Sequence, residues 1–301
     1  MKGGLARRLG LGGRGAVIAV PLFWLLVFFL VPFLVVAKIS LSEALIAQPP
    51  FAPLAEWDGL RLMLLLNFEN FAYLWQDPLY LRAYGFSILI AFIAAFASLL
   101  IGYPMAYAIA RSPEPRRTIL LMLVILPFWT SFLLRVYAWQ GFLRSTGTVN
   151  GFLIWTGIID APIQMLQTNF AVLLGIVYMY LPFMILPLYA NIVKLDESLL
   201  EASADLGARA SVTFLRVTLP LTLPGIVAGF MLVFIPAIGE FVIPELLGGP
   251  DTLMIGRVLW NEFFANRDWP VAAAVAIAML VAVVVPIMFM RTLGERLEAG
   301  R

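Results

Sequence analysis

The most unusual ionisable residue in the sequence is a glutamate inside a long apolar stretch. Glu240 lies between Pro236 and Pro244, and its neighbours are almost all apolar. A carboxylate within a membrane segment is costly, so it marks a functional position by default. Prolines free backbone groups that then need a cavity or a packed neighbour. Glu240 is therefore predicted to line a path for a cationic ligand; the alternative is that it caps a helix or snorkels near the outer interface.

Three aromatic side chains in other apolar stretches could bind the same kind of ligand. Aromatic rings attract ammonium groups through cation–π interactions worth about 2 kcal/mol or more when desolvated. Trp129 follows Pro127 in one stretch, and Tyr178 and Tyr180 lie in another. The alternative interpretation is an interfacial aromatic belt, which we favour for Trp139. Periodicity does not separate bundle-facing from lipid-facing positions here, so Trp129, Tyr178 and Tyr180 are candidates for the substrate path.

The composition excludes most bond-making chemistry. The chain has no Cys and no His, so disulfides, thiolate metal sites, Ser–His catalysis and histidine zinc sites are ruled out. It also lacks the Gly-x-x-x-x-Gly-Lys-Ser/Thr motif that binds phosphates, so work driven by ATP requires a separate ATPase chain. We expect no catalytic residue, no metal site and no nucleic-acid partner. An intramembrane enzyme is the weakest hypothesis.

The overall composition is that of a membrane protein. Of the 301 residues, 62% are hydrophobic and only 13% are charged, and several apolar runs reach the roughly 20 residues that span a bilayer as a helix. The predicted fold is all-α and polytopic, with six transmembrane helices in contact with membrane lipid. Their approximate ranges are 16–39, 83–110, 118–139, 168–190, 221–247 and 270–290. Gly225 and Gly229 in the fifth helix predict close packing against another helix.

The distribution of positive charge predicts an orientation. Six spans place both termini on one side, and that side carries thirteen of the 20 Lys and Arg residues. Because short cytoplasmic loops are rich in Lys and Arg, we expect both termini in the cytoplasm. Residues 1–15 are then a cytoplasmic basic leader, and residues 16–301 a single transmembrane domain.

A polar, helix-prone segment separates the fourth and fifth apolar runs. Ala, Leu and Glu favour a helix from Asp196 to Leu206, and Gly207 can end it in a left-handed conformation. Phe214, Val217 and Leu219 then give a second helix an apolar stripe. The two helices and the glycine break make a bent knob (residues 196–220) suited to docking into a groove of another protein. The alternative is an ordinary surface helix with solvated carboxylates.

The residues of the knob resemble the EAA loop in the membrane subunits of ATP-binding-cassette (ABC) importers. The matching positions are Glu201, Ala202, Asp205, Gly207, Ala208, Phe214, Leu219 and Pro220, with Ser203 in place of the usual second alanine. The resemblance implies that the loop 191–220 holds a coupling helix, shaped by Glu201, Ala202, Asp205 and Gly207, that sits in a cleft of a cytoplasmic ATPase dimer. It also implies a second homologous permease subunit, a periplasmic substrate-binding protein, and ATP and Mg bound by the partner ATPase.

Four further segments resemble those of one group of ABC importers. They are similar to segments of polyamine-importer permeases, most of all the putrescine permease subunit, and comprise residues 127–139, 239–250, 255–260 and 266–270. The resemblance implies a subunit of the bacterial inner membrane that moves putrescine or a related small cation. One alternative is an ABC permease for another solute such as an anion, whose pore should be lined by Arg or Lys. The other is an ion-gradient-driven secondary transporter, which should show inverted repeats and needs no docking helix.

Overall fold

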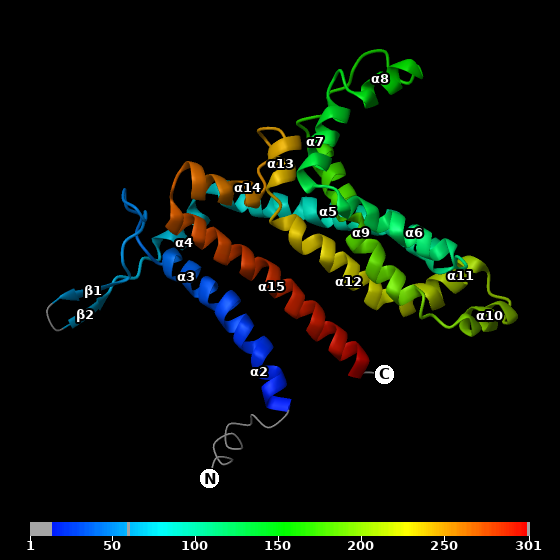
Figure 1. The fold of residues 1–301 in the computed structure, drawn as a ribbon, viewed down its shortest axis with the longest axis horizontal. Coiled ribbons are helices and arrows are strands. Elements are labelled where there is room, and N and C mark those ends of the chain that lie inside the picture. Colours follow the sequence, from blue (N-terminus) through cyan, green and yellow to red (C-terminus); the bar gives the residue numbers. More distant parts are fainter. Residues whose placement is uncertain (1–13, 59–60, 300–301) are drawn as a thin grey trace, which may run out of the picture. The chain divides into compact units, whose positions relative to one another are not determined.

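The computed structural model describes residues 14–58 and 61–299, so most of the predicted leader lies outside the described residues. The contacts between the described residues divide into two compact units. Unit 1 comprises Met1–Pro78 with Leu259–Arg301, and unit 2 comprises Leu79–Val258. Figure 1 labels the elements of both units. Helices dominate each of them, as the apolar composition predicts.

Unit 1 is built from the first apolar segment and the last. Its elements are α2 (Arg14–Leu25), the π-helix η1 (Leu26–Leu30), α3 (Val31–Ser40), β1 (Ala55–Asp58), β2 (Arg61–Leu64), α4 (Glu69–Gln76), the π-helix η4 (Asn261–Ala265) and α15 (Trp269–Ala299). Helix α15 packs against α3 and α4 (Figure 1). The amide of Asn70 donates to the carbonyls of Ser40 (2.9 Å) and Ser42 (2.8 Å). These bonds satisfy carbonyls that the end of α3 leaves free, and they fix α4 beside it.

The antiparallel pair β1–β2 is the feature of unit 1 that an all-α prediction misses. Its register pairs Ala55 with Leu64 and Asp58 with Arg61. From the sequence, residues 60–66 were expected only to pack on the membrane surface. Two short strands in a long loop leave a weak periodic signal, because a strand of four residues contains only two repeats of the apolar–polar alternation that identifies a strand.

Unit 2 holds the remaining long helices. Its elements are α5 (Pro78–Ala110), α6 (Arg116–Ile125), the 3-10 helix η2 (Leu126–Trp129), α7 (Phe132–Leu143), α8 (Thr148–Trp155), α9 (Asn169–Ile192), α10 (Glu197–Asp205), α11 (Ala210–Thr213), the π-helix η3 (Phe214–Thr218), α12 (Leu219–Ile238), α13 (Val242–Leu247) and α14 (Ile255–Trp260). Helices α9 and α12 lie side by side (Figure 1). Helix α5 also packs into their shared core, which contains Tyr103 of α5, Met184 of α9 and Val233 of α12.

Two glycines allow α12 to approach α9 closely. A Cβ atom on Gly225 would lie 2.7 Å from the Cβ of Asn191, and one on Gly229 would lie 2.8 Å from the sulfur of Met184. Both distances are shorter than van der Waals contact. The predicted role of Gly225 and Gly229 in close helix packing is confirmed.

The structure is that of a polytopic helical membrane protein. Four helices are long and apolar enough to cross a membrane: Val17–Ser40, Pro78–Ala110, Asn169–Ile192 and Ala210–Ile238. A fifth span results if Arg116–Trp129 and Phe132–Trp155, which meet at 91°, count as one. The sixth predicted span falls in α15, whose apolar part within the described residues is the shorter Trp269–Val284.

Two predicted spans differ from the observed helices. The third was expected to be continuous over 118–139, but it changes to a 3-10 helix at Leu126 and breaks where Thr130 adopts an extended conformation. Pro127 has no N–H to donate, which favours that change. The fifth was expected to run over 221–247 with breaks at its prolines, but α12 continues past Pro224 and Pro236 to Ile238, and the break lies between Ile238 and Val242. Glu240 lies inside this second break.

Candidate functional sites

The carboxylate of Glu240 is buried and fully engaged. The side chain is 7% exposed. The hydroxyl of Tyr180 donates to its Oε2 at 2.5 Å. Its Oε1 accepts from the backbone N–H of Val242 at 3.1 Å and of Ile243 at 3.4 Å. Glu240 therefore connects three parts of unit 2: the end of α12, the start of α13 and the middle of α9.

Glu240 caps a helix, as one of the two alternatives from the sequence predicts. The two backbone donors are the first residues of α13, whose N–H groups have no partner within the helix. The break itself is also packed tightly, because a Cβ on Gly256 would lie 2.4 Å from the carbonyl oxygen of Gly239. Glu240 is thus a buried anchor of the break between α12 and α13.

Of the three aromatic candidates for the substrate path, Tyr180 contacts Glu240, whereas Tyr178 and Trp129 have other surroundings. The ring of Tyr180 lies 6.0 Å from that of Phe183, and Phe183 in turn makes an edge contact with Phe128. Tyr178 instead packs its ring on Trp139 at 5.4 Å. Trp129 is 83% exposed on the isolated chain. Residues two apart on a helix point about 200° apart, which is why Tyr178 and Tyr180 do not share a site.

The row of rings that runs from Tyr180 through Phe183 to Phe128 was not predicted from the sequence. Phe128 and Phe183 come from η2 and α9, and the guanidinium of Arg135 lies 5.8 Å from the centre of the Phe128 ring. From the sequence, Arg135 could snorkel or pair with an acidic residue of an outer loop, and neither alternative places it beside these rings. The prolines beside Phe128 and Phe183 were the signal available in the sequence, since each marks a place where a helix bends toward a neighbour.

The knob forms the bent pair of helices that the sequence predicts. At its start, Asp196 Oδ1 accepts from the backbone N–H of Ser198 at 3.0 Å, which caps α10. This backbone hydrogen bond holds the pKa of Asp196 below its usual value. At its end, Gly207 has a φ of 77°. The N–H groups of Gly207 and Ala208 bond back to the carbonyls of Ala204 and Ser203, the pattern of a Schellman helix stop.

Three side-chain contacts hold the two halves of the knob together and attach it to the long helices. The hydroxyls of Ser203 and Thr213 lie 2.8 Å apart across the bend. Phe214 packs its ring edge-on against Tyr103 of α5 at 5.5 Å. The ion pair between Arg111 and Glu197 connects the end of α5 to the start of α10. Ser203, which stands where the EAA loop usually has its second alanine, supplies one of these contacts through its hydroxyl.

The four predicted coupling residues lie together on the surface of the knob. Glu201, Ala202, Asp205 and Gly207 are all exposed. Leu206, between them, is 89% exposed. The part of the knob that the resemblance assigns to docking is therefore accessible on the isolated chain.

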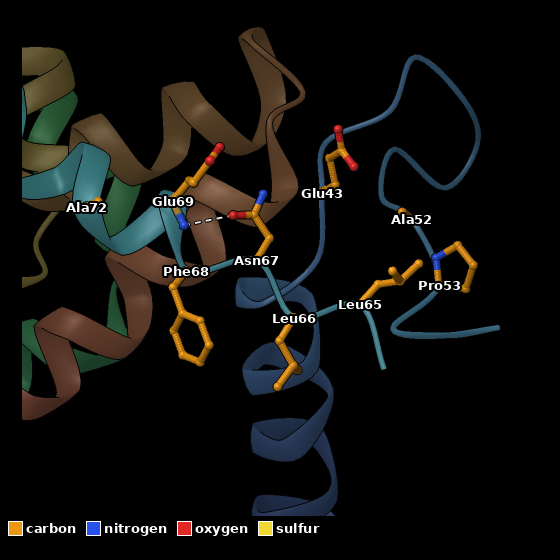
Figure 2. Close-up of a pocket in the computed structure, with 9 residues that line it drawn as sticks. All are labelled: Glu43, Ala52, Pro53, Leu65, Leu66, Asn67, Phe68, Glu69 and Ala72. Atoms are coloured by element: carbon orange, nitrogen blue, oxygen red, sulfur yellow. Dashed lines mark hydrogen bonds between the residues drawn. The ribbon is translucent and has the colours of Figure 1, made fainter. Parts of the chain in front are cut away.

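Unit 1 holds a separate open pocket of about 590 Å³, lined by residues between Glu43 and Ala72. Figure 2 shows the carboxylates of Glu43 and Glu69 on one side of it and the apolar side chains of Leu66 and Phe68 on the other. The backbone N–H of Glu69 donates to the Asn67 side chain at 2.7 Å. None of the site residues predicted from the sequence lies in this pocket.

Comparison with known proteins defines the class of the protein. The family model described as binding-protein-dependent transport system inner membrane component matches residues 98–298. The chain belongs to this family. It is therefore an inner-membrane subunit of an ABC importer, a transport component and not an enzyme, and its resemblance to permeases of that class is confirmed. A secondary transporter and an intramembrane enzyme are thereby excluded.

Individual relatives and structures agree with this class. The chain is 42% identical over 258 residues to the spermidine/putrescine transport system permease protein PotB of Escherichia coli K12, covering 86% of this chain and 89% of that protein. It is 43% identical over 265 residues to PotB of Haemophilus influenzae, covering 88% of each. Its fold resembles a chain in the crystal structure of a bacterial alginate ABC transporter bound to its periplasmic protein, with a TM-score of 0.69, 21% identity and coverage of 97% and 98%.

Proposed function

We propose that the chain is a permease subunit of an importer that carries spermidine, putrescine or a related polyamine into the cytoplasm. The observation that carries the substrate class is the similarity to permeases of spermidine/putrescine systems, above 40% identity over nearly nine tenths of the chain. The buried carboxylate of Glu240 supports it, because a polyamine is a small cation and an anion pore would be lined by Arg or Lys. Among the polyamines, the resemblance found in the sequence favours putrescine as the substrate.

We place Glu240 and Tyr180 on the substrate path. An ammonium group that approaches Glu240 competes with the Tyr180 hydroxyl for Oε2, while Oε1 stays bound to the start of α13. Substrate binding would then release Tyr180 without dismantling the break. Tyr178 and Trp129 are proposed as additional ring surfaces along the path, on the strength of cation–π attraction.

We place the docking surface for the ATPase on the knob. Glu201, Ala202 and Asp205 present carboxylates and a small side chain on one exposed helix, and Gly207 sets the bend that follows. The complete importer then contains this chain, a second homologous permease, an ATPase dimer that binds ATP and Mg, and a periplasmic substrate-binding protein. In this arrangement the knob and both termini lie in the cytoplasm, as the excess of Lys and Arg predicts.

Reconstitution tests the proposal. The chain is co-expressed with the other subunits encoded in its native host, purified, and placed in liposomes with ATP inside and the binding protein outside. We expect uptake of radiolabelled putrescine or spermidine that requires both ATP and the binding protein. Sulfate serves as the anion control. ATP-dependent uptake of sulfate and none of either polyamine would refute the substrate class.

A further inference from the structure

The end of α5 is attached to the beginning of the knob by a contact between two charged side chains distant in sequence. Arg111, the first residue after α5, places Nη1 2.5 Å from Oε1 of Glu197. Glu197 lies in the first turn of α10. Each charge also suits its helix end, because a cation stabilises a helix C-terminus and an anion an N-terminus.

The two partners of this ion pair have different surroundings. The side chain of Arg111 is 23% exposed and that of Glu197 is 74% exposed. The guanidinium of Arg111 lies 5.6 Å from the centre of the Tyr107 ring. Its Nε and Nη2 atoms are buried and have no hydrogen-bond partner within the part of the chain that the structure describes. Without Glu197, Arg111 would keep a largely covered charge with no counter-ion, whereas Glu197 without Arg111 would simply be hydrated.

A second contact attaches the knob to α5 further along the helix. The Phe214 ring lies against Tyr103, and the Tyr103 hydroxyl lies 2.9 Å from Thr222 Oγ1 in α12. Tyr103 and Arg111 are eight residues apart, which is about 12 Å along a helix. The Ser203–Thr213 hydroxyl pair links the two halves of the knob that make these contacts. The knob therefore holds the last two turns of α5 at two points.

We propose that Arg111 is a positioning residue that couples the knob to α5, so that displacement of the knob moves α5 together with α9 and α12. Helices α9 and α12 are joined to the knob through the backbone, but α5 is joined to it only by side chains. The proposal rests on the proposed function in one respect, since it takes the knob as the surface that an ATPase displaces. It adds the route by which a third long helix receives that displacement.

The test measures polyamine molecules imported per ATP hydrolysed in the reconstituted importer. We expect Arg111→Gln to lower this ratio about two- to fivefold, the effect that corresponds to the loss of a partly exposed ion pair, with ATP hydrolysis retained. Glu197→Gln should lower it further, because it leaves the covered guanidinium unpaired. Arg111→Lys should restore most of the ratio. Arg116→Gln is the matched control, since it removes the same charge five residues further on, at the exposed first residue of α6.

The outcomes separate this inference from the proposed function. If Arg111→Gln imports as many molecules per ATP as the wild type, in a complex assembled to the same level, the coupling role is refuted. If the wild-type complex shows no ATP-driven polyamine uptake, the proposed function fails instead.

A thiol pair tests whether the knob moves as one body. The chain has no Cys, so Ser203→Cys combined with Thr213→Cys supplies its only thiols. Closing that disulfide should leave the ratio unchanged. A loss on oxidation that reductant reverses would show that the bend must flex, and would overturn the proposed route.

Discussion

Three substitutions test whether Glu240 only stabilises the break or also binds the substrate. They are Glu240→Ala, Glu240→Gln and Tyr180→Phe. Alanine removes the acceptor of three hydrogen bonds, from Tyr180, Val242 and Ile243. Glutamine keeps one acceptor oxygen, and its amide can still donate to the Tyr180 oxygen. Phenylalanine at position 180 removes only the hydroxyl. The three variants therefore share one site and differ in what they delete.

The geometry sets the expected sizes of these effects. A buried donor left without a partner costs about 1–3 kcal/mol, and a hydrogen bond to a charged group contributes about 1.5–3 kcal/mol. Glu240→Ala strands the Tyr180 hydroxyl and the Val242 N–H, while the 3.4 Å bond from Ile243 adds little. We expect a loss of about 3–5 kcal/mol for Glu240→Ala, about 1.5–3 for Tyr180→Phe and about 1–2 for Glu240→Gln.

The assay has two readouts for each variant. The free energy of unfolding of the purified chain is measured by titration with SDS, and polyamine uptake is measured in the reconstituted importer. If the charge acts on the substrate, Glu240→Gln should lower uptake by more than its small loss of stability explains. Wild-type uptake in Glu240→Gln would remove Glu240 from the path. Unfolding free energies of Glu240→Ala equal to those of the wild type would show that the hydrogen bonds described here do not stabilise the break.

Three other predictions concern the knob and the helix packing. Glu201→Arg should abolish coupled uptake while membrane insertion and expression stay normal, as seen by fractionation and transport; wild-type uptake would contradict a docking role. Gly229→Ala should destabilise the chain by about 1–3 kcal/mol because its Cβ would overlap Met184, whereas Gly85→Ala, with no atom within 4 Å of the new Cβ, should not; equal SDS midpoints would refute this. Because the pKa of Asp196 is lowered by its cap, that cap contributes stability above the unfolded pKa near 4 and loses it as pH falls through the lower folded value. Hydrogen exchange of the Ser198 amide should show this loss, and Asp196→Asn should not; protection that ignores pH would contradict it.

Local signals in the sequence were sufficient to predict the knob. Asp196 can cap a helix through its own backbone neighbours, and Gly207 can end one because it tolerates a positive φ. Both effects act within a few residues, so the sequence predicts them without knowledge of the fold. The helix from Asp196 to Leu206 has the predicted limits, with those two residues as its caps.

The breaks at Thr130 and Gly239 depend on contacts that the sequence does not display. Pro224 and Pro236 lie inside α12 without ending it, whereas the chain breaks at Gly239, where Glu240 finds Tyr180 sixty residues away. Proline content alone therefore predicted a broken helix but not the position of the break. Likewise, the partner of Arg111 lies 86 residues distant, and nothing near either residue indicates the other.

The Arg111–Glu197 ion pair also bears on how the chain crosses the bilayer between α5 and α9, because it brings the ends of these two helices together. Glu197 follows the end of α9 by five residues, which reach at most about 17–18 Å, less than the roughly 30 Å hydrocarbon core. Both α5 and α9 therefore end at the same face of the membrane. The chain leaves that face after Ala110 and returns to it through α9, so it must cross once in between. We therefore predict that the broken pair, Arg116–Trp129 with Phe132–Trp155, crosses the membrane instead of forming a re-entrant loop.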